Sequence, residues 1–72
     1  MHATGSTPFG DRLKQARRER GFSATSFCKR VGIAQCMLGG YENRGVKPRF
    51  DVLIAMAQVL DCSLDWLCGL EN

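Results

Sequence analysis

The sequence predicts an all-α protein, a compact domain of five short helices. Apolar residues recur at the 3.6-residue spacing of amphipathic helices, and no segment alternates as a strand does. Serine residues precede several of these helical patterns and glycines follow them, as helix caps do. A chain of 72 residues has room for one small domain, which buries only about 60% of its unfolded surface.

The first helix is expected to begin at Phe9, because Phe9, Leu13 and Ala16 share one face. Gly21 supplies a natural stop. The preceding residues, 1–8, are small and polar without periodicity, which predicts a disordered arm. The helical domain is therefore expected over residues 9–70.

The second and third helices are joined through a glycine. Ser23 is a good N-cap for the second helix, and Gly32 ends it. The apolar side of this helix consists of Phe27, Cys28 and Val31. A third helix is expected over about residues 34–41. Its inward residues are expected to be Met37, Leu38 and Tyr41.

A basic loop over residues 43–48 leads to the fourth helix, which has the strongest amphipathic pattern in the chain. Its apolar face is expected to hold Phe50, Leu53, Ile54, Ala57 and Leu60. Ser63 caps a last short helix, which contains Leu64 and Leu67 and ends at Gly69.

Charge is distributed unevenly along the chain, whose net charge is +3. Residues 1–50 contain all ten Lys and Arg and only three acidic residues, a net charge of +7. Residues 51–72 contain four acidic residues and no basic one, a net charge of −4. This division predicts one basic face that suits a polyanion and a second face with another role, although an unevenly charged solvated surface would look the same.

The four cysteines are Cys28, Cys36, Cys62 and Cys68. They form no CxxC or CxxxC pair, and the only histidine is His2, so no metal-ligand spacing is present. The N-terminus lacks the pattern of a secretory signal, which predicts a cytoplasmic protein without disulfides. We therefore expect these cysteines to act as small core-filling hydrophobes, with no metal and no cofactor.

Catalytic and membrane functions have little support. A nucleophilic thiol needs a neighbouring base, and no second histidine, pair of carboxylates on one face or phosphate-binding glycine loop is found. The longest apolar runs fall far below the roughly 20 residues of a membrane span. We expect neither enzyme activity, nor a small-molecule substrate, nor a membrane partner.

Residues 23–41 have the features of a helix-turn-helix. Cys28 lies where two short helices cross closest, a position that accepts only a small side chain. Gly32 permits the positive φ of a tight turn. The second helix of such a pair presents its N-terminal end outward, in the orientation that a major groove accepts.

Residues 9–69 resemble the phage-repressor and Cro type of helix-turn-helix domain. The matching segments, in order, are residues 9–13 with Arg17, then 21–23, 31–33, 41–43, 47–50 and 63–67. The resemblance implies a repressor-like transcriptional regulator that binds double-stranded DNA sequence-specifically as a homodimer. It places a recognition helix, about residues 34–41, in the major groove.

The same resemblance implies the site residues. The base-reading positions are Gln35, Cys36, Gly39 and Gly40. The Gln35 amide suits a bidentate contact to adenine or a single contact to guanine. The phosphate-binding positions are Ser23, Asn43, Arg44, Lys47 and Arg49. Arg17 and Glu42 match a pair that links the first helix to the end of the recognition helix by a structural ion pair. Trp66 and Leu70 belong either to a dimer surface or, for Trp66, to a lid over the core.

Three departures from the family pattern leave a second interpretation open. Ala24 replaces a common phosphate-binding Gln, and Ala34 replaces a Ser or Thr cap. Gly39 and Gly40 offer no side chain to a base. The domain either reads few bases and relies on phosphates, or it is a protein-interaction module, antitoxin-like or antirepressor-like. Because only three residues follow Gly69, we expect a stand-alone protein without a sensing domain.

Overall fold

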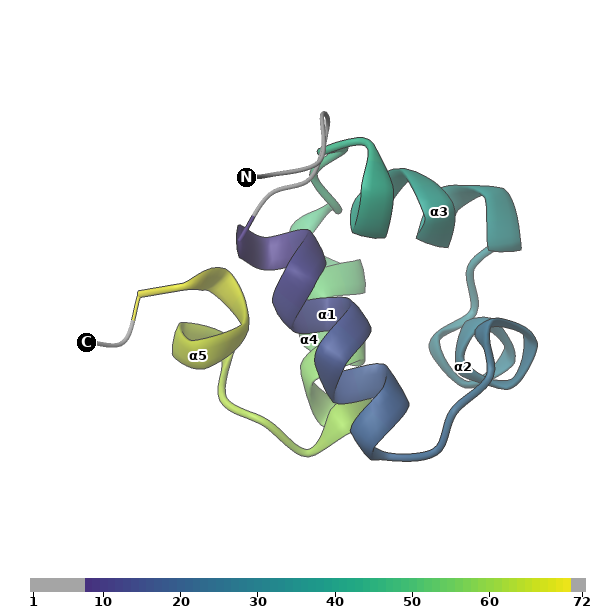
Figure 1. Cartoon of the computed structure of the whole chain (residues 1–72), viewed down its shortest axis with the longest axis horizontal. Helices are drawn as coiled ribbons and strands as arrows, with labels where there is room; N and C mark the ends of the chain where they lie inside the picture. The colour runs from purple at the N-terminus through teal and green to yellow at the C-terminus, as the bar shows by residue number, and fades with distance from the viewer. Residues whose placement is uncertain (1–7, 71–72) are drawn as a thin grey trace.

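The computed structural model describes residues 8–70, which form the five helices that the sequence predicts, with no strand in that range (Figure 1). The helices are α1 (Pro8–Glu19), α2 (Ala24–Val31), α3 (Gln35–Asn43), α4 (Phe50–Leu60) and α5 (Leu64–Cys68). The expected arm lies outside the described residues except for Pro8. This proline is the first residue of α1, a position that its fixed φ favours, so the helix begins one residue earlier than expected.

The helices pack around one core, and each contacts at least two others. Helix α1 contacts α3 and α5, whereas α2 contacts α3 and α4, and α4 also contacts α5 (Figure 1). Helix α3 lies across one end of this arrangement, supported by α1 and α2. Within the described part of the chain, no helix has the length and apolar character needed to cross a membrane.

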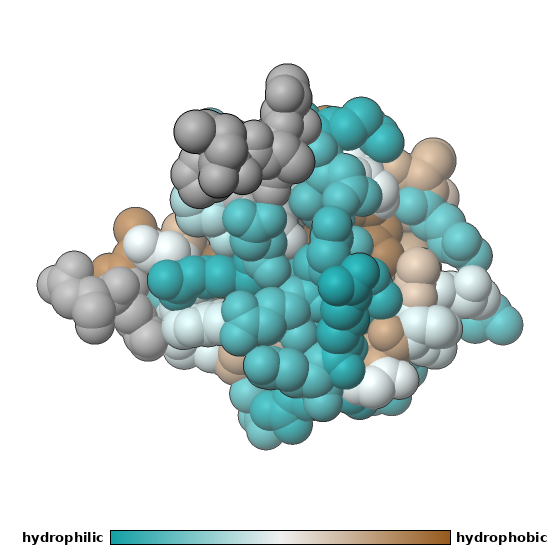
Figure 2. Space-filling model, viewed as in Figure 1, coloured by the Kyte–Doolittle hydropathy of each residue, from teal (hydrophilic) through white to brown (hydrophobic). Residues whose placement is uncertain are grey.

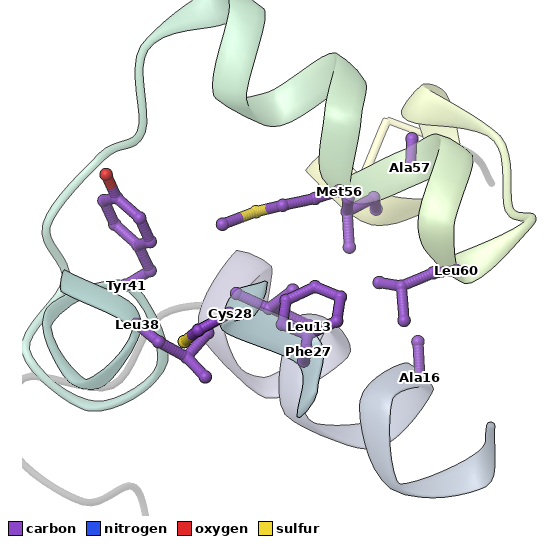
Figure 3. Packing of buried hydrophobic residues seen from close by; sticks show 10 residues of the cluster. Leu13, Ala16, Phe27, Cys28, Leu38, Tyr41, Met56, Ala57 and Leu60 are labelled. Carbon is purple, nitrogen blue, oxygen red and sulfur yellow. The ribbon is translucent and has the colours of Figure 1, made fainter. Parts of the chain in front are cut away.

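The core draws on every helix (Figure 3). The largest fully buried side chains come from α1, α2, α4 and α5; they are Leu13, Phe27, Met56, Leu60 and Leu67. Helix α3 adds Leu38 and Tyr41 to the core, and Leu38 lies beside Cys28 of α2 (Figure 3). Burial of Leu38 and Tyr41 therefore sets the direction in which the opposite face of α3 points.

Two predicted core positions are corrected, and one core residue was not predicted. Phe50 is 71% exposed, because it is the first residue of α4 and lies beyond the end of the packed face. Met37 is 42% exposed, because Leu38 and Tyr41 define the inward side of α3 and leave Met37 beside it. Met56, which the sequence analysis did not assign to the core, is fully buried, so the inner face of α4 runs through Met56, Ala57 and Leu60.

The cysteines are also less uniform than expected. Cys28 is buried, Cys62 and Cys68 are half-buried, and Cys36 is exposed on α3. Burial raises the pKa of the Cys28 thiol, the Glu42 carboxylate raises it further and Arg17 lowers it. Cys36 is not a core residue, because it lies on the side of α3 away from Leu38.

Candidate nucleic-acid interface

The turn between α2 and α3 fixes the relative orientation of the two helices. Gly32 has a φ of 89°, and its N–H donates to the Cys28 carbonyl over 2.7 Å. The Ile33 N–H donates to the same carbonyl over 3.1 Å. This left-handed cap ends α2 and redirects the chain so that α3 begins at Gln35 with its first turn exposed.

Helix α1 approaches the C-terminal end of α3 through a glycine. Gly10 is buried, and a Cβ atom built on it would lie 2.7 Å from the Glu42 carbonyl oxygen and 2.8 Å from that of Tyr41. No larger residue fits without separating the two helices. The sequence analysis included Gly10 in the family match but gave it no role; its signal was a glycine inside a helix, where glycine is unfavourable.

An ion pair fastens the same end of α3 to α1. Arg17 Nε donates to Glu42 Oε2 over 2.8 Å, and Nη2 donates to Oε1 over 3.2 Å, the two-pronged geometry of a strong pair. Arg17 Nη1 also donates to the Phe22 carbonyl over 3.0 Å. The two side chains are only 12% and 5% exposed. The structure thus contains the Arg17–Glu42 pair that the sequence analysis expected.

Gln35 lies at the exposed start of α3, as expected of a base-reading candidate. Its Nε2 donates to Thr25 Oγ1 of α2 over 2.8 Å. Thr25 therefore orients the Gln35 amide, while the Gln35 carbonyl oxygen is not used in that contact. The sequence analysis missed Thr25, whose only signal was a hydroxyl in the first turn of α2, next to Ala24.

Gly40 does not face outward, which corrects its assignment as a base-reading position. Gly40 is buried beneath Arg44 and Val46. A Cβ atom built on it would lie 3.1 Å from Arg44 Nη2 and 3.2 Å from Val46 Cγ2. Its carbonyl accepts the backbone N–H groups of Arg44 and Val46, each over 3.1 Å, so the loop folds back over it. Gly39 is half-buried and has only Arg44 Nη1 near its Cβ position, at 3.6 Å.

The expected phosphate-binding residues occupy the surface around α3. Asn43, Arg44, Lys47 and Arg49 are all exposed. Asn43 Oδ1 accepts from Lys14 Nζ over 2.6 Å, which adds a cation from α1 that the sequence analysis had not considered. Arg49 lies 3.8 Å from the Asp51 carboxylate, with both side chains largely exposed.

Ser23 is exposed and caps α2. Its hydroxyl oxygen accepts the Ser26 N–H over 3.1 Å, as predicted for the N-cap. Ala34, the N-cap residue of α3, makes no such bond, so α3 begins without a side-chain cap. Among the described residues, no group of three or more His, Cys, Asp and Glu could hold a metal ion.

A second surface is apolar. A groove of about 290 Å³ lies between α1, the loop before α4 and α5, with Phe9, Val46, Leu53 and Cys68 among its lining residues. Leu70 is 73% exposed. Trp66 is half-buried, and the Arg12 guanidinium lies 5.2 Å from the centre of its ring. The face of α1 toward the viewer in Figure 2 is instead hydrophilic.

This geometry, a tight α2–turn–α3 unit with the start of α3 exposed and its other end fastened to α1, defines a helix-turn-helix domain. The helix-turn-helix family model matches residues 13–67, and the chain belongs to this family. It is 36% identical over 61 residues to the uncharacterized HTH-type transcriptional regulator YobD of Bacillus subtilis, covering 85% of this chain and 54% of YobD. The chain thus spans about half the length of the curated relatives it matches.

Solved structures show the same arrangement. The crystal structure of SinR, a master regulator for biofilm formation, in complex with DNA matches with a TM-score of 0.77 and 33% identity, covering 83% of this chain and 97% of that chain. The P22 c2 repressor in complex with a synthetic operator matches with a TM-score of 0.83, covering 92% of this chain and all of that chain. At 23% identity, the second match shows the fold alone.

Proposed function

We propose that this protein is a transcriptional regulator that binds double-stranded DNA, with α3 in the major groove. The proposal rests on the α2–α3 unit, because the exposed first turn of α3 lies beside a surface of cationic and amide groups. The matching SinR structure, in complex with DNA, supports it. Repressor-like regulation and a cytoplasmic location belong to the same proposal, since a regulator must share a compartment with its DNA.

Gln35 and Cys36 are the side chains at the start of α3 that we assign to base edges, whereas Gly39 contributes no side chain. Ser23 before α2, Asn43 at the end of α3, and Lys47 and Arg49 before α4 are exposed and are assigned to phosphates. Phosphate contacts supply sequence-independent affinity and orientation, whereas base contacts supply specificity.

Binding as a homodimer on a two-fold site completes the proposal. Leu70 and the apolar groove offer surface for a second copy. Arg12 covers the Trp66 ring, which supports the role of Trp66 as a lid over the core. Sedimentation of the free protein and of its DNA complex measures the stoichiometry; one protomer per selected site at all concentrations would contradict the dimer.

The function is tested by selecting duplexes from a random library and measuring binding across a range of salt concentrations. We expect Lys47→Ala to weaken selected and random duplexes equally and to lower the salt slope by about 1, because it removes one phosphate contact. Gln35→Ala should cost about 1–3 kcal/mol on the selected duplex and little on random DNA. An unchanged ratio for Gln35→Ala would exclude base readout by this residue.

The apolar groove favours one other function, that of a protein-interaction module. That function requires an exposed apolar surface and no duplex binding. If the unmodified protein shows no salt-dependent affinity for any duplex, the DNA-binding proposal fails and the interaction module replaces it. Enzyme activity finds no support in the groove, whose lining is predominantly apolar.

A further inference from the structure

Arg44 is placed differently from the other basic residues around α3. It follows the last residue of that helix, yet its side chain extends back along α3. Arg44 Nη2 donates to the Cys36 carbonyl over 3.1 Å, eight residues earlier in the chain. The guanidinium therefore lies beside the middle of the helix, next to Gly39 and Gly40.

Gly40 makes this position possible, and Gly39 leaves open space beside it. The Cβ positions of Gly39 and Gly40 lie 3.6 Å from Arg44 Nη1 and 3.1 Å from Nη2. A Cβ atom at position 40 would lie 3.1 Å from Nη2, so the guanidinium would have to shift away from its place at the Cys36 carbonyl. Together the glycines form a notch along one side of α3, and the Arg44 guanidinium fills it.

The guanidinium in this notch keeps donors for a ligand. A guanidinium has five N–H donors, and its contact with the Cys36 carbonyl uses one of them. The ion pairs of residues 8–70 involve Arg17, Arg20 and Arg49, and none includes Arg44. Arg44 is exposed, so its charge is available where Cys36 and Gly39 line the outer face of α3.

We propose, resting on the proposed DNA-binding function, that Arg44 reads a guanine edge in the major groove from the notch formed by Gly39 and Gly40. Arginine donating to guanine O6 and N7 through its two-pronged head is the commonest specific contact in the major groove. The bond to Cys36 holds the guanidinium in place before DNA arrives. The sequence grouped Arg44 with the phosphate-binding residues, but its contacts place the charge against α3 rather than in the loop.

The proposal is tested with Arg44→Lys, which keeps the charge and removes the planar fork. Binding is measured against a duplex selected by the unmodified protein, random duplexes and single-base variants of the selected duplex. We expect Arg44→Lys to retain the salt slope, to lower the ratio of selected to random affinity about tenfold and to relax the preference at one G·C pair. Arg18→Lys, at an exposed residue of α1 that is assigned no DNA contact, is the matched control and should leave that ratio unchanged.

A pair of glycine variants tests the notch itself. Gly40→Ala places a methyl group 3.1 Å from Arg44 Nη2, so the guanidinium must shift, and the preference at the same G·C pair should weaken. Gly39→Ala has 3.6 Å of space and should preserve it. Circular dichroism and thermal unfolding verify that each variant folds.

The proposal is overturned if Arg44→Lys preserves both the affinity ratio and every base preference, since Arg44 would then act as a phosphate contact or helix cap. It is equally overturned if Gly39→Ala and Gly40→Ala weaken the same preference to the same extent. Failure of the unmodified protein to bind any duplex overturns the DNA-binding function as well, and this result is distinguishable because it appears before any substitution is made.

Discussion

Helices α2 and α3 form one motif but are stabilised by different means. Ser23 caps the start of α2 through its hydroxyl, and Gly32 ends it in the left-handed conformation. Helix α3 begins at Ala34 without a side-chain cap, ends at Arg44, one residue before the left-handed Gly45, and contains two glycines. Local sequence thus defines α2 at both ends, whereas α3 lacks a side-chain cap at its start.

Contacts with α1 compensate for what α3 lacks. Gly10 permits close contact with the last turn of α3, and the Arg17–Glu42 pair fastens the same turn. Leu38 and Tyr41 anchor the inner face in the core. Tertiary contacts therefore hold the helix that we propose to bind DNA. Because α3 does not depend on high helix propensity, it can contain glycines.

The largest expected effect comes from breaking the ion pair. Glu42→Ala leaves Arg17 unpaired at 12% exposure and should lower the free energy of unfolding by about 3–5 kcal/mol. Urea unfolding followed by circular dichroism measures this loss. Arg20→Ala removes an exposed ion pair with Asp61 and should cost less than about 1 kcal/mol. Equal losses for both variants would show that the Arg17–Glu42 pair does not fasten α3.

The approach of α1 to α3 can be tested next. Gly10→Ala forces a methyl group against backbone carbonyl oxygens at 2.7 and 2.8 Å, which cannot move aside as a side chain can. We expect the free energy of unfolding to fall by about 1–3 kcal/mol, the usual cost of overpacking. Gly39→Ala has 3.6 Å of space, so its better helix propensity should raise stability by up to about 1 kcal/mol. A stable Gly10→Ala variant would contradict the close contact.

The smallest effects concern the caps and sharpen the contrast between the two helices. Ser23→Ala removes the bond to the Ser26 N–H and should lower the free energy of unfolding by about 1 kcal/mol. Ala34 already has the extended conformation of an N-cap, with φ −78° and ψ 151°, so Ala34→Ser should raise stability by about 0.5–1 kcal/mol. Thermal unfolding of both variants measures the difference. A lower free energy of unfolding for Ala34→Ser would show that α3 does not lack a cap.

Much of the fold could be predicted because the relevant signals are local. Ser23 and Ser63 cap the helices they precede, while Gly32 and Gly69 end α2 and α5 at positive φ. These features act within a few residues, so sequence spacing reveals them. Phe50 was assigned to the core wrongly and Met56 was missed, because one helical period fits more than one face and only packing shows which face is covered.

The candidate site could be predicted only in outline. The exposed start of α3 and the basic surface follow from the order of helices and the charges near them. The bond between Gln35 and Thr25 and the Lys14–Asn43 contact join side chains of different helices, and no local pattern indicates such pairs. Gly40 was wrongly predicted to face outward, because a glycine has no side chain to indicate which residues cover it.

The sequence by itself determined the number, order and caps of the helices and the division of charge between the two parts of the chain. Tertiary structure decided how α3 is held, why Gly10 must lack a side chain and where the Arg44 guanidinium lies. The physical reason is the separation along the chain over which each kind of interaction acts. Capping and helical period are set by neighbours within one or two turns, whereas close packing and side-chain contacts join residues that the fold alone brings together.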